Sequence, residues 1–139
     1  MVVLERAIKF EEVDAAAIVF FARFVNYGHE AMEHFFSHLP GGYAGLIVGR
    51  RIGFPAVHLD VSFASPARFG DTLRIETRVA KLGNRSAVFH YRMLNAAGGA
   101  LVAELRHTVV TSDLREVTSC DMPADVRALL SQHLEPGDP

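Results

Sequence analysis

The residue best placed for chemistry in this sequence is a single carboxylate, Asp14, which precedes an amphipathic segment. It opens the run Asp14-Ala15-Ala16-Ala17-Ile18-Val19-Phe20-Phe21, and apolar residues then recur at helical spacing, which predicts a helix beginning at about Phe20. The first N–H groups of a helix are unpaired and lie at the positive end of its dipole, so they can stabilise negative charge developing on a carbonyl oxygen. An acid beside them suggests acyl-transfer chemistry. Alternatively, Asp14 only caps the helix or a preceding turn.

The composition is that of one globular domain over residues 1–139, with 50% hydrophobic residues available for a single core. Fourteen basic and sixteen acidic residues give a formal charge of -2 without a basic block, which argues against nucleic acid as a partner. The single Cys120 excludes an internal disulfide, and Glu5, Arg6 and Lys9 interrupt any signal-peptide core. The longest apolar run, residues 15–22, is too short to span a membrane. We therefore expect a cytoplasmic protein that binds no membrane.

The order of the expected elements indicates an α+β domain. A strand is predicted over residues 2–10, and the helix should stop at Pro40-Gly41-Gly42. After a loop or short helix over residues 43–51, strands are predicted over 54–64, 72–82, 86–94 and 100–112, with a final helix over 122–134. The apolar stripe of the long helix and one apolar sheet face would bury each other, so an antiparallel sheet should wrap the helix. Because so few strands cannot close, an edge or face should pair with a second copy, giving at least a homodimer.

Three segments carry a resemblance to a known family: the run from Asp14 to Phe21, His29-Glu30-Ala31 on the following helix, and Ser65-Pro66-Ala67-Arg68-Phe69-Gly70-Asp71 before a strand. Over almost its whole length the chain resembles the 4-hydroxybenzoyl-CoA thioesterase class of hot-dog acyl-CoA thioesterases. The segment Phe54-Pro55-Ala56-Val57-His58-Leu59 is particularly similar to the 1,4-dihydroxy-2-naphthoyl-CoA thioesterases of that class. The resemblance implies a hot-dog fold, an acyl-CoA substrate, and a dimer or a dimer of dimers, that is, a homotetramer.

The resemblance also assigns roles to two catalytic positions. In the family, an Asp at the position of Asp14 attacks the thioester or activates water, and the residue at the position of Phe21 offers its backbone N–H to the thioester carbonyl. The family usually has Gly where this chain has Ala17, and Ala could crowd a close approach to the substrate. Relatives that act on short aliphatic acyl groups commonly carry His at the Phe21 position and Glu at the His29 position. This chain has neither, which favours an aromatic acyl group.

The expected substrate-binding residues come from four segments. His58 shares one strand face with Asp60 and could line the acyl pocket, although a core or interface histidine is the alternative. His29 lies about two helical turns beyond Phe21 and could reach an aromatic hydroxyl, while Phe20 could stack on the ring. The family binds the phosphates of coenzyme A near the turn between two central strands, where Arg85 aligns, Lys81 is close and Arg115 is a weaker candidate.

Other constellations are incomplete. His29-Glu30 followed by His34 misses the zinc-binding spacing His-Glu-x-x-His by one residue, and His34 with His38 lacks a third ligand, so we expect no metal and no cofactor. No serine stands in a Gly-x-Ser-x-Gly elbow. Two other functions stay open: a hot-dog enoyl-CoA hydratase, which would need an Asp/His pair over the acyl chain, and a non-catalytic protein that binds acyl thioesters.

Overall fold

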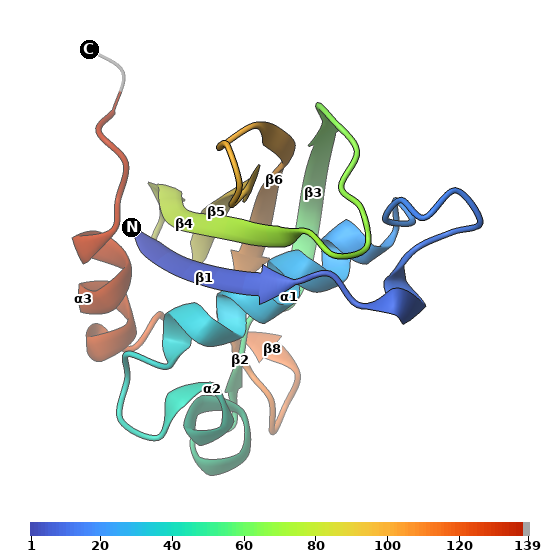
Figure 1. Cartoon of the computed structure of the whole chain (residues 1–139). Helices are drawn as coiled ribbons and strands as arrows, with labels where there is room; N and C mark the ends of the chain where they lie inside the picture. Colours follow the sequence, from blue (N-terminus) through green and yellow to red (C-terminus); the bar gives the residue numbers. More distant parts are fainter. Residues whose placement is uncertain (138–139) are drawn as a thin grey trace.

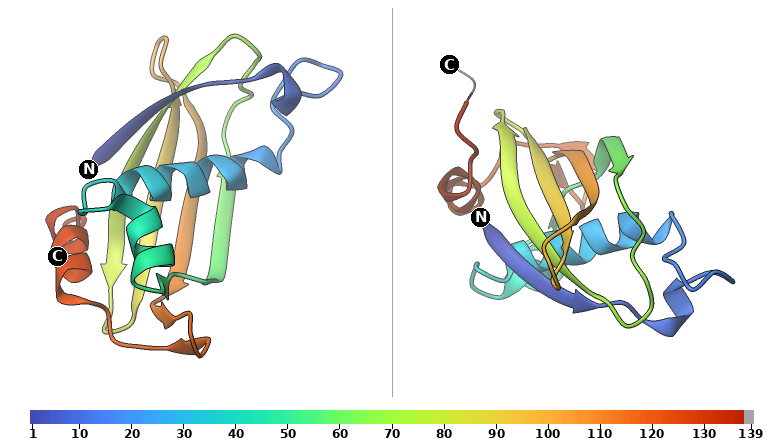
Figure 2. Two further views of the ribbon diagram at one scale, coloured as in Figure 1. Left: turned by 90° about the horizontal axis from the view of Figure 1, so that it is seen from below. Right: turned by 45° about the horizontal axis from the view of Figure 1, so that its top comes forward.

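A computed structural model describes residues 1–137 as a curved sheet that holds one long helix (Figure 1). The sheet is antiparallel and five-stranded, with the order β1-β4-β5-β6-β3. Its strands are β1 (Val2–Ala7), β3 (Ala56–Phe63), β4 (Thr72–Leu82), β5 (Ser86–Asn95) and β6 (Leu101–Val110). The long helix is α1 (Arg23–Phe36), and Figure 2 shows it lying across one face of the sheet. The expected α+β arrangement, a sheet wrapped around one helix, is therefore confirmed.

Smaller elements surround this unit. A 3-10 turn, η1 (Phe10–Glu12), follows β1, while α2 (Gly42–Ala44) and a π-helical turn, η2 (Gly45–Gly49), follow α1. A second sheet has the order β2-β7-β8, from β2 (Ile52–Gly53), β7 (Ser112–Asp113) and β8 (Thr118–Ser119). The last helix, α3 (Ala124–Gln132), lies beside β4 (Figure 1). Within residues 1–137, no helix is both long and apolar enough to cross a membrane.

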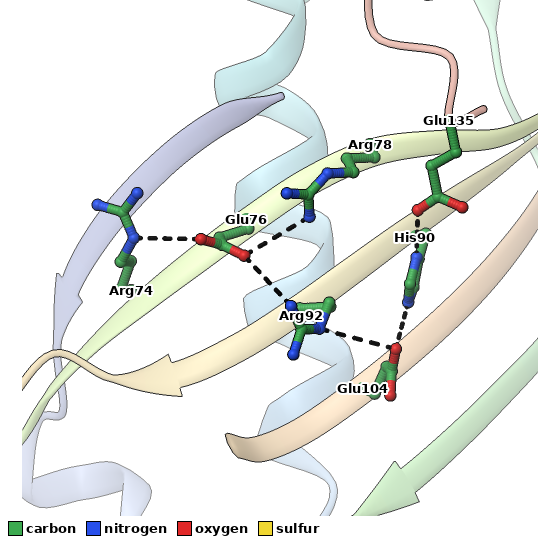
Figure 3. Close-up of polar contacts among 7 residues, drawn as sticks. All are labelled: Arg74, Glu76, Arg78, His90, Arg92, Glu104 and Glu135. Carbon is green, nitrogen blue, oxygen red and sulfur yellow. Dashed lines mark hydrogen bonds and ion pairs between the residues drawn. The ribbon is translucent and has the colours of Figure 1, made fainter. Parts of the chain in front are cut away.

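The core lies between α1 and the inner face of the sheet. Helical spacing puts one stripe of α1 against the strands, and alternation turns every second strand residue inward. The largest fully buried side chains of this interface are Tyr27, Met32, Phe35, Phe36, Leu73, Ile75, Phe89, Tyr91, Met93 and Leu105. The outer face of the same strands instead carries a charged network (Figure 3), in which Glu76 contacts Arg74, Arg78 and Arg92, and His90 contacts Glu104 and Glu135. An apolar ligand therefore belongs on the helix side of the sheet.

The ends of the long helix differ from the expected ones. α1 begins at Arg23 rather than Phe20, because the preceding residues form tight turns, with Arg23 N–H donating to Phe20 O (2.9 Å) and Phe24 N–H to Phe21 O (3.3 Å). No side chain caps this start, which favours such i to i+3 turns over a full α-helical turn. The helix ends at Phe36, and similar turns continue to Leu39 before Pro40.

The strand β3 is an open edge. Every residue from Ala56 to Asp60 is exposed, and large apolar side chains reach solvent, with 60% of Val57 and 55% of Phe63 accessible. An exposed apolar edge without Pro or Lys is a template for pairing with another chain.

Candidate active site

Asp14 lies in a tight turn that is held by its own hydrogen bonds. Its N–H donates to Ile18 O (2.9 Å), its carbonyl accepts Ala17 N–H (2.9 Å), and its Oδ1 accepts Ala16 N–H (2.8 Å). The capping role considered from the sequence is therefore present. It occupies only one carboxylate oxygen, because Oδ2 has no hydrogen bond within residues 1–137. The exposed carboxylate thus keeps one oxygen for a substrate or a water molecule.

The turn needs a left-handed residue at Ala17, whose φ is +62°. This conformation costs roughly 1–2 kcal/mol for residues other than Gly. The glycine that the related thioesterases usually carry here is thus explained by backbone conformation. The turn also packs against the segment from Ser65 to Asp71, because Phe69 N–H donates to Ala17 O (3.2 Å) and Val19 N–H to Ala67 O (2.8 Å). Two segments that carried the resemblance therefore meet in space.

Phe21 lies two residues before α1 and carries an unpaired N–H, close to the helix start at which the sequence predicted one. Phe20 N–H donates to Glu12 O (3.0 Å), whereas Phe21 N–H has no acceptor within residues 1–137. Both side chains are exposed, with ring centroids 4.9 Å apart. Phe21 borders a cavity of about 290 Å³ whose other walls are Val19, Phe24, Phe63, Ala64, Ser65, Pro66 and Ala67. A free carboxylate oxygen, an unpaired N–H at a helix start and an apolar cavity are parts that acyl transfer requires.

A buried ion pair holds the segment that carries Asp14. The Arg6 guanidinium contacts both carboxylate oxygens of Glu12 and donates from Nε to Glu30 (2.8 Å), while lying 4.3 Å from the Tyr27 ring centre. Burial alone would raise the pKa of Glu12, but hydrogen bonds from Arg6 and from Lys9 N–H outweigh it and lower that pKa. Sequence reasoning missed this cluster, because nothing in the local pattern pairs a strand arginine with a later glutamate.

A second cavity, of about 220 Å³, lies further along α1. Its walls are Val25, Gly28, His29, Ala56, Leu59, Tyr91, Leu105 and His107. The Tyr91 hydroxyl lies 3.1 Å from His107 Nδ1, and His29 Nε2 lies 3.4 Å from Glu33. Burial raises the pKa of Tyr91 well above its ordinary value, and burial followed by the charge of His29 lowers the pKa of His107. Strand alternation could have identified Tyr91 as inward, but its partner His107 depends on strand register.

His58 is not part of either cavity. It forms the expected pair with Asp60 (3.1 Å), so their shared strand face is confirmed. That face is the outer one, because Leu59 between them pairs with His107 and lines the second cavity. Within one chain His58 therefore borders neither cavity, and its expected contact with substrate stays a prediction.

Arg85 and Lys81 lie at the far end of the sheet from Asp14. The strand β4 starts next to Asp71, near the Asp14 turn, and its eleven residues carry the chain about 33 Å to the Arg85 turn. There Arg85 pairs with Asp121 (3.0 Å) and also contacts Ser119, while Lys81 is exposed. One chain therefore does not bring Arg85 to Asp14. Among residues 1–137, no three His, Cys, Asp or Glu side chains cluster as metal ligands would.

Comparison with known proteins identifies the family. Residues 8–130 match the family model of the thioesterase-like superfamily. The chain belongs to this superfamily. A 1,4-dihydroxy-2-naphthoyl-CoA hydrolase of Crocosphaera subtropica is 28% identical to it over 120 residues, which cover 84% of this chain and 88% of that one.

Solved structures of the superfamily share the fold. A member from Jannaschia sp. superposes with a TM-score of 0.89 at 25% identity, covering 97% of this chain and 94% of that one. A gentisyl-coenzyme A thioesterase superposes with a TM-score of 0.81 at 27% identity, covering 92% and 98%. The expected hot-dog fold and thioesterase class are thereby confirmed.

Proposed function

We propose that this protein hydrolyses an aromatic acyl-CoA to the free acid and coenzyme A. Two observations carry the proposal: Asp14 has one unengaged carboxylate oxygen, and Phe21, seven residues later, has an unpaired N–H and borders an apolar cavity. The relatives named above act on dihydroxynaphthoyl and gentisyl thioesters, which supports an aromatic acyl group carrying hydroxyls.

The site would work as follows. The thioester carbonyl oxygen accepts a hydrogen bond from Phe21 N–H, so the start of α1 stabilises the oxyanion. Asp14 either removes a proton from a water that attacks the carbonyl carbon or attacks that carbon itself. The carbon–sulfur bond then breaks, and the thiolate of coenzyme A takes up a proton. Where Asp14 itself attacks, the product of this step is an acyl–Asp14 anhydride, which water hydrolyses to the free acid while the Asp14 carboxylate is regenerated. Phe20 would lie beside the acyl ring.

The same proposal includes a homodimer through β3. At one end of β3, Ala56 pairs with Val109 of β6, and Val109 in turn pairs with Ala87 of β5, two residues beyond Arg85. The other end, Phe63, borders the Phe21 cavity. Two antiparallel copies of β3 would thus place the Ala56 end of one subunit beside the Phe63 end of the other.

In this dimer, β3, β6 and β5 of the partner subunit would follow β3 in one continuous sheet. Arg85 of the partner subunit, just before its β5, would therefore lie three strand spacings, about 14 Å, from Phe63. A ligand as long as coenzyme A could then reach from Phe21 of one subunit to Arg85 and Lys81 of the partner. Whether two such dimers join into a homotetramer is a further part of the proposal. The single free thiol, Cys120, supports a cytoplasmic location, where thiols stay reduced.

A panel of acyl-CoA substrates, followed with a thiol reagent, tests the proposal. Hydroxyaryl thioesters should exceed short aliphatic ones in kcat/KM, and thiol release should occur without any change in unsaturation. Thiol retention with a new hydroxyl on the acyl chain would indicate a hydratase, and binding without thiol release would indicate a non-catalytic protein.

The matched variants are Asp14→Asn and Asp113→Asn. Asp113 makes the same kind of turn, accepting Arg115 N–H at 2.9 Å, but lies outside the site. Asp14→Asn should lower kcat by about 10² or more, since the amide cannot act as base or nucleophile, whereas Asp113→Asn should leave it unchanged. An Asp14→Asn enzyme with more than about a tenth of the wild-type kcat would contradict the role of Asp14.

A further inference from the structure

The cavity beside α1 contains a polar pair that the reaction at Asp14 does not use. Most of its walls are apolar, and the exceptions are His29 and the hydrogen-bonded pair Tyr91 and His107. Its volume of about 220 Å³ would hold roughly seven waters at the density of the liquid, or one aromatic ring. A buried tyrosine hydroxyl on an otherwise apolar wall needs a hydrogen-bond partner, and His107 supplies it.

The hydrogen bond determines which His107 nitrogen carries a proton. Burial disfavours the charged forms of both residues, so Tyr91 keeps its hydroxyl proton and His107 is neutral. Tyr91 has no other acceptor within residues 1–137, so its hydroxyl donates to His107 Nδ1. The ring proton then lies on Nε2, which makes no hydrogen bond in the described chain and is not sealed from solvent. His107, a wall residue of the cavity, thus carries an unengaged N–H whose place the Tyr91 hydrogen bond fixes.

Gly28 lets one wall of the cavity pack close to α1. A Cβ at Gly28 would lie 3.2 Å from Leu105 Cδ2, tighter than most packed contacts, and 3.4 Å from Tyr91 Cδ2. Any side chain at position 28 would therefore press against this wall of the cavity.

The position of the cavity indicates which subunit's substrate could enter it. Within one chain, the α1 residues of this cavity, Val25, Gly28 and His29, lie one to two helical turns beyond Phe21. An acyl ring whose carbonyl is bound at Phe21 of the same chain meets the Phe21 cavity first, and His107 is not among the walls of that cavity. The cavity also includes Ala56 and Leu59, at the end of β3 that the proposed dimer sets beside Phe63 of the partner subunit. The partner's Phe21 cavity is then about one strand spacing, roughly 5 Å, away.

We propose that this cavity is the subsite for the oxygen substituent of the acyl group: His107 Nε2–H donates to a ring hydroxyl of a substrate whose thioester is held at Asp14 and Phe21 of the partner subunit. Tyr91 is a positioning residue that fixes the His107 tautomer. This inference rests on the proposed aryl-CoA hydrolysis.

The test is the ratio of kcat/KM for the best monohydroxybenzoyl-CoA isomer to that for benzoyl-CoA. His107→Leu should lower this ratio about tenfold, the usual effect of one lost hydrogen bond. Tyr91→Phe should lower it in part, because the imidazole can then adopt either tautomer. His34→Leu, a histidine remote from both cavities, is the matched control and should leave the ratio unchanged.

Mixed dimers show which subunit supplies the donor. Combining Asp14→Asn chains with His107→Leu chains creates one site with Asp14 from the second chain and His107 from the first. That site should regain the wild-type ratio. A ratio that stays low in mixed dimers, with subunit exchange confirmed, would overturn the assignment to the partner.

The remaining outcomes are also decisive. An unchanged ratio in His107→Leu, or equal losses on both substrates, would overturn the subsite while leaving aryl-CoA hydrolysis intact. A wild-type protein that hydrolyses neither aryl thioester would instead overturn the proposed function, and the subsite with it.

Discussion

Replacing Glu12 by Gln should strongly destabilise the fold, because it leaves Arg6 buried without its main counter-charge. Only 6% of the Glu12 side chain and 10% of the Arg6 side chain reach solvent. Removing one partner of such a pair typically costs about 3–5 kcal/mol. For a chain of 139 residues the unfolding entropy is about 0.3 kcal/mol per kelvin, so Tm should fall by about 10 to 17 °C at fixed protein concentration.

Glu30→Gln is the matched control, since it removes the other carboxylate that Arg6 contacts. Glu30 is 40% exposed, so its contribution should be about 1 kcal/mol or less, a Tm change of at most about 3 °C. Glu12→Gln should also lower kcat by up to about 10²-fold below Tm, because weakening the contact with Arg6 loosens the segment whose backbone carbonyl at position 12 holds Phe20, next to the proposed oxyanion donor Phe21. Equal Tm losses in the two variants, measured by thermal unfolding, would refute this account of the cluster.

The pH dependence follows from the lowered pKa of Glu12. A carboxyl with a lowered folded-state pKa contributes stability above its unfolded value, here 4.5, and loses it as pH falls through the folded value. Wild-type Tm should therefore drop below about pH 4.5, and Glu12→Gln should flatten this drop.

Three further outcomes are expected. Mixing Asp14→Asn with Arg85→Glu subunits should restore hydrolysis through sites that combine Asp14 and Arg85 from different chains, and no recovery at any ratio would place each site in one chain. Ala17→Gly should raise the free energy of unfolding by up to about 1 kcal/mol, since it relieves the positive φ at some entropic cost, and a lower Tm would contradict this. Val57→Lys on the β3 edge should give inactive monomers by light scattering, while Val48→Lys, at a still more exposed valine on η2, should stay dimeric.

The sequence predicted those features of the fold that depend on a local pattern of residues. Helical spacing and strand alternation depend on neighbours along the chain, so the element order and the inward face of β5 followed from them. The start of α1 was set three residues too early, because the apolar pattern continues through Phe20 while the backbone there forms 3-10-type turns. The unpaired N–H at Phe21 was nevertheless located, since it depends on the helix starting nearby and not on its first residue.

Contacts between residues on neighbouring strands could not be predicted from such local patterns. Alternation showed that His58 and Asp60 share a face, but a register shift between Ala56 and His58 and the pairing with β6 decide that this face is outside. The contact of Tyr91 with His107 is diagonal, because Tyr91 pairs with Leu105 and Phe89 with His107. A shift of one residue in this register would turn His107 away from the cavity. Specificity residues on neighbouring strands are therefore the part of this site that a single sequence conceals.

The distribution of charged side chains also favours the helix side of the sheet as the place of the reaction. On the outer face, Glu76 and His90 are less than a tenth exposed, and each is already paired with groups of the same chain (Figure 3). Covering these groups with an apolar acyl chain would remove their remaining hydration without offering new partners. On the helix face, the two cavities have the opposite character, since their walls are mostly apolar and one unengaged N–H group on each, at Phe21 and at His107, lacks an acceptor in the described chain. A thioester with a polar substituent at its far end would supply an acceptor for each.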